Sequence, residues 1–120
     1  MRPADDPILK RFRAALNEVY SARRECVVLF GSRARGDGRE DSDHNIAVFI
    51  KDFGTFSNEL HPLASVTTDI LLDTSAVISA KPFHAGAYRE RTGFMHELRR
   101  DGTELMKSGA PTISARPVNV

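Results

Sequence analysis

The stretch from residue 27 to residue 50, VVLFGSRARGDGREDSDHNIAVFI, constrains the fold more than any other part of the sequence. It starts with an apolar run of strand length that ends at Gly31 and Ser32. It finishes with a run of period two, in which Ile46, Val48 and Ile50 alternate with Asn45, Ala47 and Phe49. Glycines, arginines and then acids separate the two runs. The stretch therefore predicts two strands joined by a charged turn.

The turn and the second strand carry groups that suit phosphate and metal binding. Asp43 and Asn45 are two residues apart, so on a strand they project to the same side, about 7 Å apart along the chain. Mg²⁺ is usually held by one or two carboxylates together with substrate phosphates. Gly31 lets the backbone approach a phosphate closely, and Ser32 adds a donor. A Gly-Ser pair alone is most often a turn, and an Asp-x-Asn pair is most often solvated or a cap; the order and spacing of all four indicate a site.

Basic residues concentrate around the first strand although the net charge of the chain is only +1. From Lys10 to Arg39 eight basic residues face three acids, a local net charge of +5. This balance indicates an anionic partner, and Arg33 and Arg35 can supply charge-assisted hydrogen bonds to a triphosphate. For the part before Arg33, a solvated helix face is an equally good interpretation. No nucleic-acid motif or aromatic platform is visible, so nucleic acid is not the expected partner.

A helix is predicted from residue 5 to residue 20. Asp5, Asp6 and Pro7 form a typical helix start. Five apolar residues then repeat at helical spacing: Leu9, Phe12, Leu16, Val19 and Tyr20. The pattern predicts an amphipathic helix of two to four turns that packs on another part of the protein.

The segment after the second strand predicts a third strand. Between residues 51 and 62, Gly54 and Pro62 leave room for at most a turn or two of helix. Val66, Thr68, Ile70 and Leu72 then alternate with Thr67, Asp69 and Leu71. On such a strand Asp69 would lie opposite the aliphatic face, as Asp43 and Asn45 do on theirs, and could complete a cup of oxygen ligands.

The C-terminal part predicts one more helix and a tail. Residues 76–78 are too short an apolar run to assign, and Pro82 is expected to break whatever precedes it. A helix is predicted from residue 88 to residue 100, with Gly102 as its stop and a stripe that includes Tyr88, Thr92, Met95 and Leu98, widened by Phe94. Residues 107–120 are rich in Ser, Pro and Gly and are expected to be mobile or to pack on a partner. We expect one domain over residues 5–106 and a tail over residues 107–120.

Size and composition are those of an ordinary globular protein. The chain has 120 residues, of which 41% are hydrophobic and 28% charged, enough for one modest core. Its longest apolar run falls far short of the roughly 20 residues that span a membrane. No targeting segment is legible at the N-terminus, so a cytoplasmic location is expected. The lone cysteine, Cys26, is expected to be a small buried hydrophobe.

The segment GSRARGDGREDSDHNIAVF resembles the signature of minimal nucleotidyltransferases of the DNA polymerase beta superfamily. That signature has glycine-serine-x-alanine-arginine-glycine, a short spacer, and serine-aspartate-x-aspartate-leucine. The resemblance implies an α+β fold with a mixed sheet flanked by helices, and transfer of a nucleotidyl group from ATP or another nucleotide with Mg²⁺. It implies that Gly31 and Ser32 hold phosphates.

By the same resemblance the metal ligands would be Asp43, the residue at position 45, and Asp69, with Asp73 as the alternative to Asp69. Asn45 departs from the family, because it stands where the family has its second aspartate. An amide offers one neutral oxygen in place of a carboxylate, so metal affinity is expected to fall. His44, between the two positions, points the other way on a strand and is expected to be structural.

Two functions from different classes follow. Small members of the family resemble the antitoxin of bacterial toxin-antitoxin pairs, whose partner is a small helical toxin; the first is thus an adenylyl-transferring antitoxin, weakened or inactivated by Asn45. The second is a catalytically silent module that neutralises a partner protein by contact. An Asn45→Asp change separates them.

Overall fold

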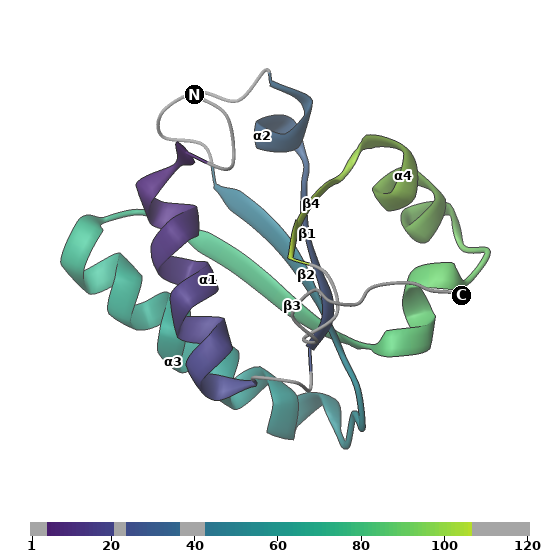
Figure 1. The fold of residues 1–120 in the computed structure, drawn as a ribbon, viewed down its shortest axis with the longest axis horizontal. Helices are drawn as coiled ribbons and strands as arrows, with labels where there is room; N and C mark the ends of the chain where they lie inside the picture. The colour runs from purple at the N-terminus through teal and green to yellow at the C-terminus, as the bar shows by residue number, and fades with distance from the viewer. Residues whose placement is uncertain (1–4, 21–23, 37–42, 107–120) are drawn as a thin grey trace, which may run out of the picture.

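The computed structural model describes residues 5–20, 24–36 and 43–106 (Figure 1). The predicted loop over residues 37–42 and the tail over residues 107–120 lie outside this part. The elements are, in chain order, α1 (Pro7–Val19), β1 (Arg24–Phe30), α2 (Ser32–Arg35), β2 (His44–Ile50), α3 (Phe56–Thr74), β3 (Ile78–His84), the 3₁₀ helix η3 (Ala85–Arg89), α4 (Gly93–Asp101) and β4 (Thr103–Met106).

The four strands of the described part form one mixed sheet in the order β3-β2-β1-β4. β1 runs antiparallel to both β2 and β4, and β2 runs parallel to β3. Helices pack on both faces of the sheet (Figure 1). The expected α+β fold with a mixed sheet flanked by helices is confirmed.

The alternation along β2 is as predicted, and in the structure it divides the core into two layers. Ile46, Val48 and Ile50 pack with α1 and α3 on one face, and Ala47 and Phe49 pack with η3 and α4 on the other. All five side chains are fully buried. A shift of β2 by one residue would move each set of side chains to the other face of the sheet. The burial pattern therefore fixes Asn45 on the same face as Ala47 and Phe49.

Helix α1 begins and packs as expected. The Asp6 side chain caps it by accepting a hydrogen bond from the backbone N–H of Ile8, and Pro7 takes the first helical position. Leu9, Phe12, Leu16 and Tyr20 are buried, whereas Val19 remains 44% exposed and does not belong to the stripe.

The predicted strand over residues 66–72 is wrong, because these residues belong to α3, a helix of 19 residues. Thr55 caps the helix by accepting a hydrogen bond from Asn58 N–H, and Leu63, Val66 and Ile70 are buried at helical spacing. Pro62 lies inside the helix and does not end it. Proline has no N–H to donate to the carbonyl of the residue four positions earlier, which here is Asn58. Asn58 is exposed and lies near the helix start, so the hydrogen bond is lost at the exposed end of the helix.

Two further boundaries differ from the sequence prediction. Pro82 does not break a strand; it lies within β3, at the edge of the sheet, where a missing N–H leaves no neighbouring strand unpaired. Tyr88 belongs to η3, and α4 starts after its cap Thr92, with Met95 and Leu98 buried and Gly102 after its end.

Cys26 is buried as expected. None of the helices in the described ranges is long and apolar enough to cross a membrane.

Candidate functional site

The turn between β1 and α2 brings a glycine against the second strand. Gly31 has φ +81° and ψ −159°, a conformation that is essentially restricted to glycine, and its carbonyl accepts hydrogen bonds from Ala34 N–H and Arg35 N–H. The short α2 ends at Gly36, which is left-handed with φ +85°. The segment predicted to be a charged turn thus begins with a short helix.

Strand pairing places Asn45 beside this turn. Phe30 and Asn45 are register partners in the antiparallel β1/β2 pair. The Asn45 amide nitrogen lies 3.0 Å from the position that a Cβ on Gly31 would occupy. A side chain at Gly31 would therefore displace the Asn45 amide, so the two halves of the sequence motif meet at one point of the sheet.

Asp43 lies immediately before β2 and is exposed, whereas Asn45 is half-buried within the strand. The residue between them, His44, is buried and its backbone N–H donates to the carbonyl of Val77. Alternation puts Asp43 and Asn45 on the face opposite His44. The Asn45 amide thus lies against the Gly31 turn, and the exposed carboxylate of Asp43 is two residues before it on the same side.

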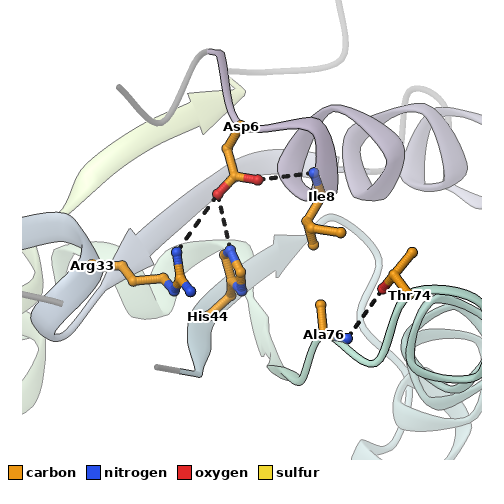
Figure 2. A network of polar contacts seen from close by, with 6 residues as sticks. All are labelled: Asp6, Ile8, Arg33, His44, Thr74 and Ala76. Carbon is orange, nitrogen blue, oxygen red and sulfur yellow. Dashed lines mark hydrogen bonds and ion pairs between the residues drawn. The ribbon is translucent and has the colours of Figure 1, made fainter. Parts of the chain in front are cut away.

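The Asp6 side chain joins three elements: α1, α2 through Arg33, and β2 through His44 (Figure 2). Its Oδ2 lies 3.0 Å from His44 Nε2 and 3.8 Å from Arg33 Nη1, while its Oδ1 accepts from Ile8 N–H at 2.9 Å. Burial raises the pKa of Asp6, but the hydrogen bonds from His44 and Ile8 and the charge of His44 outweigh it, so the pKa is lowered overall. His44 Nδ1 is buried without a hydrogen-bond partner in the described part of the chain. The prediction that His44 is structural agrees with its burial and its contact to Asp6.

The two arginines of the motif have different surroundings. Arg33 points to Asp6 and its side chain is only 20% exposed, so its charge is partly balanced within the protein. Arg35, at the end of α2, is exposed. Arg35 is thus the more exposed of the two, and like Arg33 it interacts with other residues of the protein.

The structure does not bring the two further acids to this site. Asp69 lies at an exposed position of α3, and α3 packs on the face of the sheet opposite Asn45. Asp73 is near the end of the same helix, where its Oδ2 accepts a hydrogen bond from Arg11 Nη2 at 2.7 Å. The expectation that a third carboxylate comes from a strand over residues 66–72 fails because that segment is helical.

The donor set fits one metal ion better than two. Among residues 5–20, 24–36 and 43–106, no group of three His, Cys, Asp or Glu side chains could hold a metal ion. Asp43 and the Asn45 carbonyl oxygen are hard ligands of the kind that Mg²⁺ accepts when substrate phosphates complete its coordination. They do not provide the pair of carboxylates that would hold two ions close together.

An aromatic cluster beside the site was not foreseen from the sequence. Phe30 meets Phe94 edge to face with ring centroids 5.3 Å apart, and Phe83 lies 6.0 Å from Phe94. Phe83 and Tyr88 in turn contact the buried Phe49. The sequence places phenylalanines at positions 30 and 49 of the two predicted strands, and this was the only signal of an aromatic cluster. Phe83 and Phe94 join the cluster through tertiary packing, which a local pattern does not show.

The chain belongs to the polymerase beta nucleotidyltransferase family. The profile of the family described as "Polymerase beta, Nucleotidyltransferase" matches residues 18–108. This range includes the Gly31-Ser32 turn, Asp43 and Asn45, so the family expected from the motif is confirmed.

Similar proteins agree with this assignment. A relative from Methanocaldococcus jannaschii, named "Putative protein adenylyltransferase", is 28% identical over 103 residues, which cover 82% of this chain and 95% of the relative. A crystal structure of a mutant of the toxin-antitoxin MntA-HpeT has a TM-score of 0.58 at 14% identity and covers 82% of this chain and 72% of that chain. A crystal structure of a toxin-antitoxin with AMP-PNP has a TM-score of 0.56 at 15% identity over 80% of this chain and 71% of that one. A "putative nucleotidyltransferase" from Sulfolobus solfataricus has a TM-score of 0.56 at 19% identity over 89% of each chain.

Proposed function

We propose that this protein binds ATP with Mg²⁺ and transfers an adenylyl group to a protein acceptor. The observation that carries the proposal is the contact of Asn45 with the Gly31 turn, because the family motif implies a phosphate-binding role for Gly31 and a metal-binding role for position 45. In the reaction a hydroxyl oxygen of the acceptor loses its proton to water and forms a bond to the α-phosphorus, while the bond from that phosphorus to the bridging oxygen breaks and pyrophosphate leaves with the bonding electrons.

The described residues have separate parts in this proposal. Gly31 and Ser32 approach the phosphates, with Arg35 as an exposed cation near the end of the same short helix. Asp43 and Asn45 would bind Mg²⁺, which supplies charge neutralisation on the phosphates when it is bound. Asp6 and His44 hold the start of β2, and Arg33 contacts the same carboxylate.

Asn45 sets the expected level of activity. Replacing a ligand carboxylate by an amide removes a charge next to the metal ion. Changes to groups around a metal site typically cost about 10- to 100-fold in affinity or activity, and loss of a direct ligand should cost at least as much. We therefore propose a weakened transferase.

We further propose that the acceptor is the toxin of a toxin-antitoxin pair, a small helical protein, and that this chain is the antitoxin. Support comes from the fold shared with the two toxin-antitoxin structures and from the name of the adenylyltransferase relative. Asn45 itself favours a second function, in which the protein neutralises its partner by contact without catalysis.

Calorimetric titration of ATP, with and without Mg²⁺, into the native protein and the Asn45→Asp variant tests the site. We expect Mg²⁺-dependent binding that strengthens by about 10-fold or more in the aspartate variant. Absence of binding to both proteins would contradict the nucleotide site. Transfer of label from α-labelled ATP to a partner co-expressed from the same genomic locus distinguishes the two functions: transfer by the native protein excludes the silent module, and transfer by the Asn45→Asp variant alone supports an enzyme that Asn45 has inactivated.

A further inference from the structure

A partly exposed aromatic surface lies directly beside the proposed phosphate site. Residues opposite each other on antiparallel strands present their side chains on the same face, and Phe30 is the partner of Asn45. The Phe30 ring therefore neighbours the Asn45 amide on the face of the sheet that carries η3 and α4. Phe94, the second residue of α4, packs edge to face on Phe30 with ring centroids 5.3 Å apart and planes at 85°.

The inner members of the cluster hold Phe94 in place while leaving it open to solvent. Phe49 is fully buried and stacks on Phe83, which lies 6.0 Å from Phe94. The helix that carries Phe94 is fixed by its cap, where Thr92 Oγ1 accepts from Met95 N–H, and by buried Met95 and Leu98. Phe94 nevertheless remains 42% exposed. A large aromatic side chain is thus held on a rigid element, with part of its ring in water, one ring away from Asn45.

Two apolar side chains of the described residues that are more exposed than Phe94 lie away from the candidate site. Phe56 is 54% exposed and Leu72 is 78% exposed, and both belong to α3 on the opposite face of the sheet. Phe94 differs from them because it is continuous, through Phe30, with the residues that would hold the triphosphate. A nucleotide whose phosphates lie at the Gly31 turn could therefore reach this aromatic surface with its nucleobase.

We propose that Phe94, supported by Phe30, stacks on the nucleobase of the nucleotide whose phosphates lie at the Gly31-Ser32 turn. This inference rests on the proposed function. Stacking of a base on an aromatic side chain uses the π-face that every base has, and removing such a side chain weakens binding by about 5- to 150-fold. Phe94 is thus a binding residue for the base and not for the phosphates.

The composition of the chain allows a direct test. The sequence contains no tryptophan, so Phe94→Trp introduces a single indole at the proposed platform. We expect ATP to quench its fluorescence, and inorganic tripolyphosphate to compete with ATP without quenching. Phe94→Leu keeps an apolar side chain and removes the ring; we expect it to weaken ATP binding about 5- to 150-fold and to leave tripolyphosphate binding unchanged. Phe56→Trp and Phe56→Leu, on the opposite face, are the matched controls. ATP should not quench the fluorescence of Phe56→Trp, and Phe56→Leu should bind ATP and tripolyphosphate as the native protein does.

The outcomes show whether the stacking proposal fails alone or together with the proposed function. If ATP binds but leaves the Phe94→Trp fluorescence unchanged, or binds Phe94→Leu as tightly as the native protein, the platform is overturned and the proposed function stands. If neither ATP nor tripolyphosphate binds to the native protein or to Asn45→Asp, the proposed function fails and the platform fails with it. Should Phe94→Leu unfold, which thermal melting by circular dichroism would reveal, the tryptophan variant decides alone.

Discussion

The Oδ2 atom of Asp6 lies 3.0 Å from Nε2 of His44, and this contact joins the first helix to the strand that carries the candidate site (Figure 2). The same carboxylate caps α1 through Ile8 N–H. His44 is flanked by Asp43 and Asn45, so the position of α1 and the position of these two side chains depend on one partly buried pair. A residue that is 38 positions away in the sequence thereby supports the site.

Asp6→Ala should lower the free energy of unfolding by about 2–4 kcal/mol. The variant loses the helix cap and leaves His44 buried without its partner, and both losses are costly. Asp6→Asn keeps a capping side chain and should cost less. Urea denaturation measures the change, with Asp5→Ala as the exposed neighbouring control, for which less than about 1 kcal/mol is expected. Equal stability of Asp6→Ala and the native protein would show that the pair has no structural role.

The same carboxylate should make stability depend on pH in the acid range. The pKa of Asp6 is lowered from its ordinary value of 3.8, so the unfolded chain takes up the proton first as the pH falls. Its contribution is therefore complete well above pH 3.8 and is lost as the pH falls through the lower pKa of the folded state. The difference in unfolding free energy between native protein and Asp6→Asn should therefore shrink as the pH falls from about pH 5 toward about pH 3. A difference that grows over this acid range would contradict the assignment.

The position of Asp69 leads to a prediction that opposes the one made from the family motif alone. Asp69 lies exposed on α3, on the opposite face from Asn45. Asp69→Asn should thus leave Mg²⁺-dependent ATP binding within about twofold of the native value. Asp43→Asn should weaken it by about 10-fold or more, because it removes the carboxylate at the site. Equal losses in the two variants, measured by calorimetry, would place Asp69 in the site after all.

The sequence predicted the helices and strands whose residue pattern is compatible with only one type of secondary structure. Asp6 and Pro7 mark a helix start, the stripe of Leu9, Phe12 and Leu16 has helical spacing, and β2 alternates strictly; all three are as expected. Residues 66–72 have two readings, since Val66 and Ile70 satisfy both a strand and a helix and the threonines favour a strand. Burial of Leu63, Val66 and Ile70 against the sheet selects the helix.

The site was predictable only where it follows from neighbouring strands. Gly31 and Asn45 meet because β1 and β2 pair antiparallel around the turn between them, which the motif implies. The contact of Asp6 with His44 and that of Phe30 with Phe94 join segments 38 and 64 residues apart in the sequence. No local pattern encodes such contacts, because they depend on how helices α1 and α4 pack on the sheet.

Two glycines with similar strain provide the sharpest test of the turn itself. Gly31→Ala places alanine in a region restricted to glycine, at a cost of about 1–3 kcal/mol, and puts a Cβ 3.0 Å from the Asn45 amide nitrogen. Gly36→Ala is strained by about 1–2 kcal/mol in its left-handed conformation but meets no atom of the described residues within 4 Å. Both variants should therefore lose stability in urea, whereas only Gly31→Ala should lose affinity for ATP and for tripolyphosphate, because only there must Asn45 move. A similar loss of affinity in both would mean that the conformation of the turn matters and that its contact with Asn45 does not.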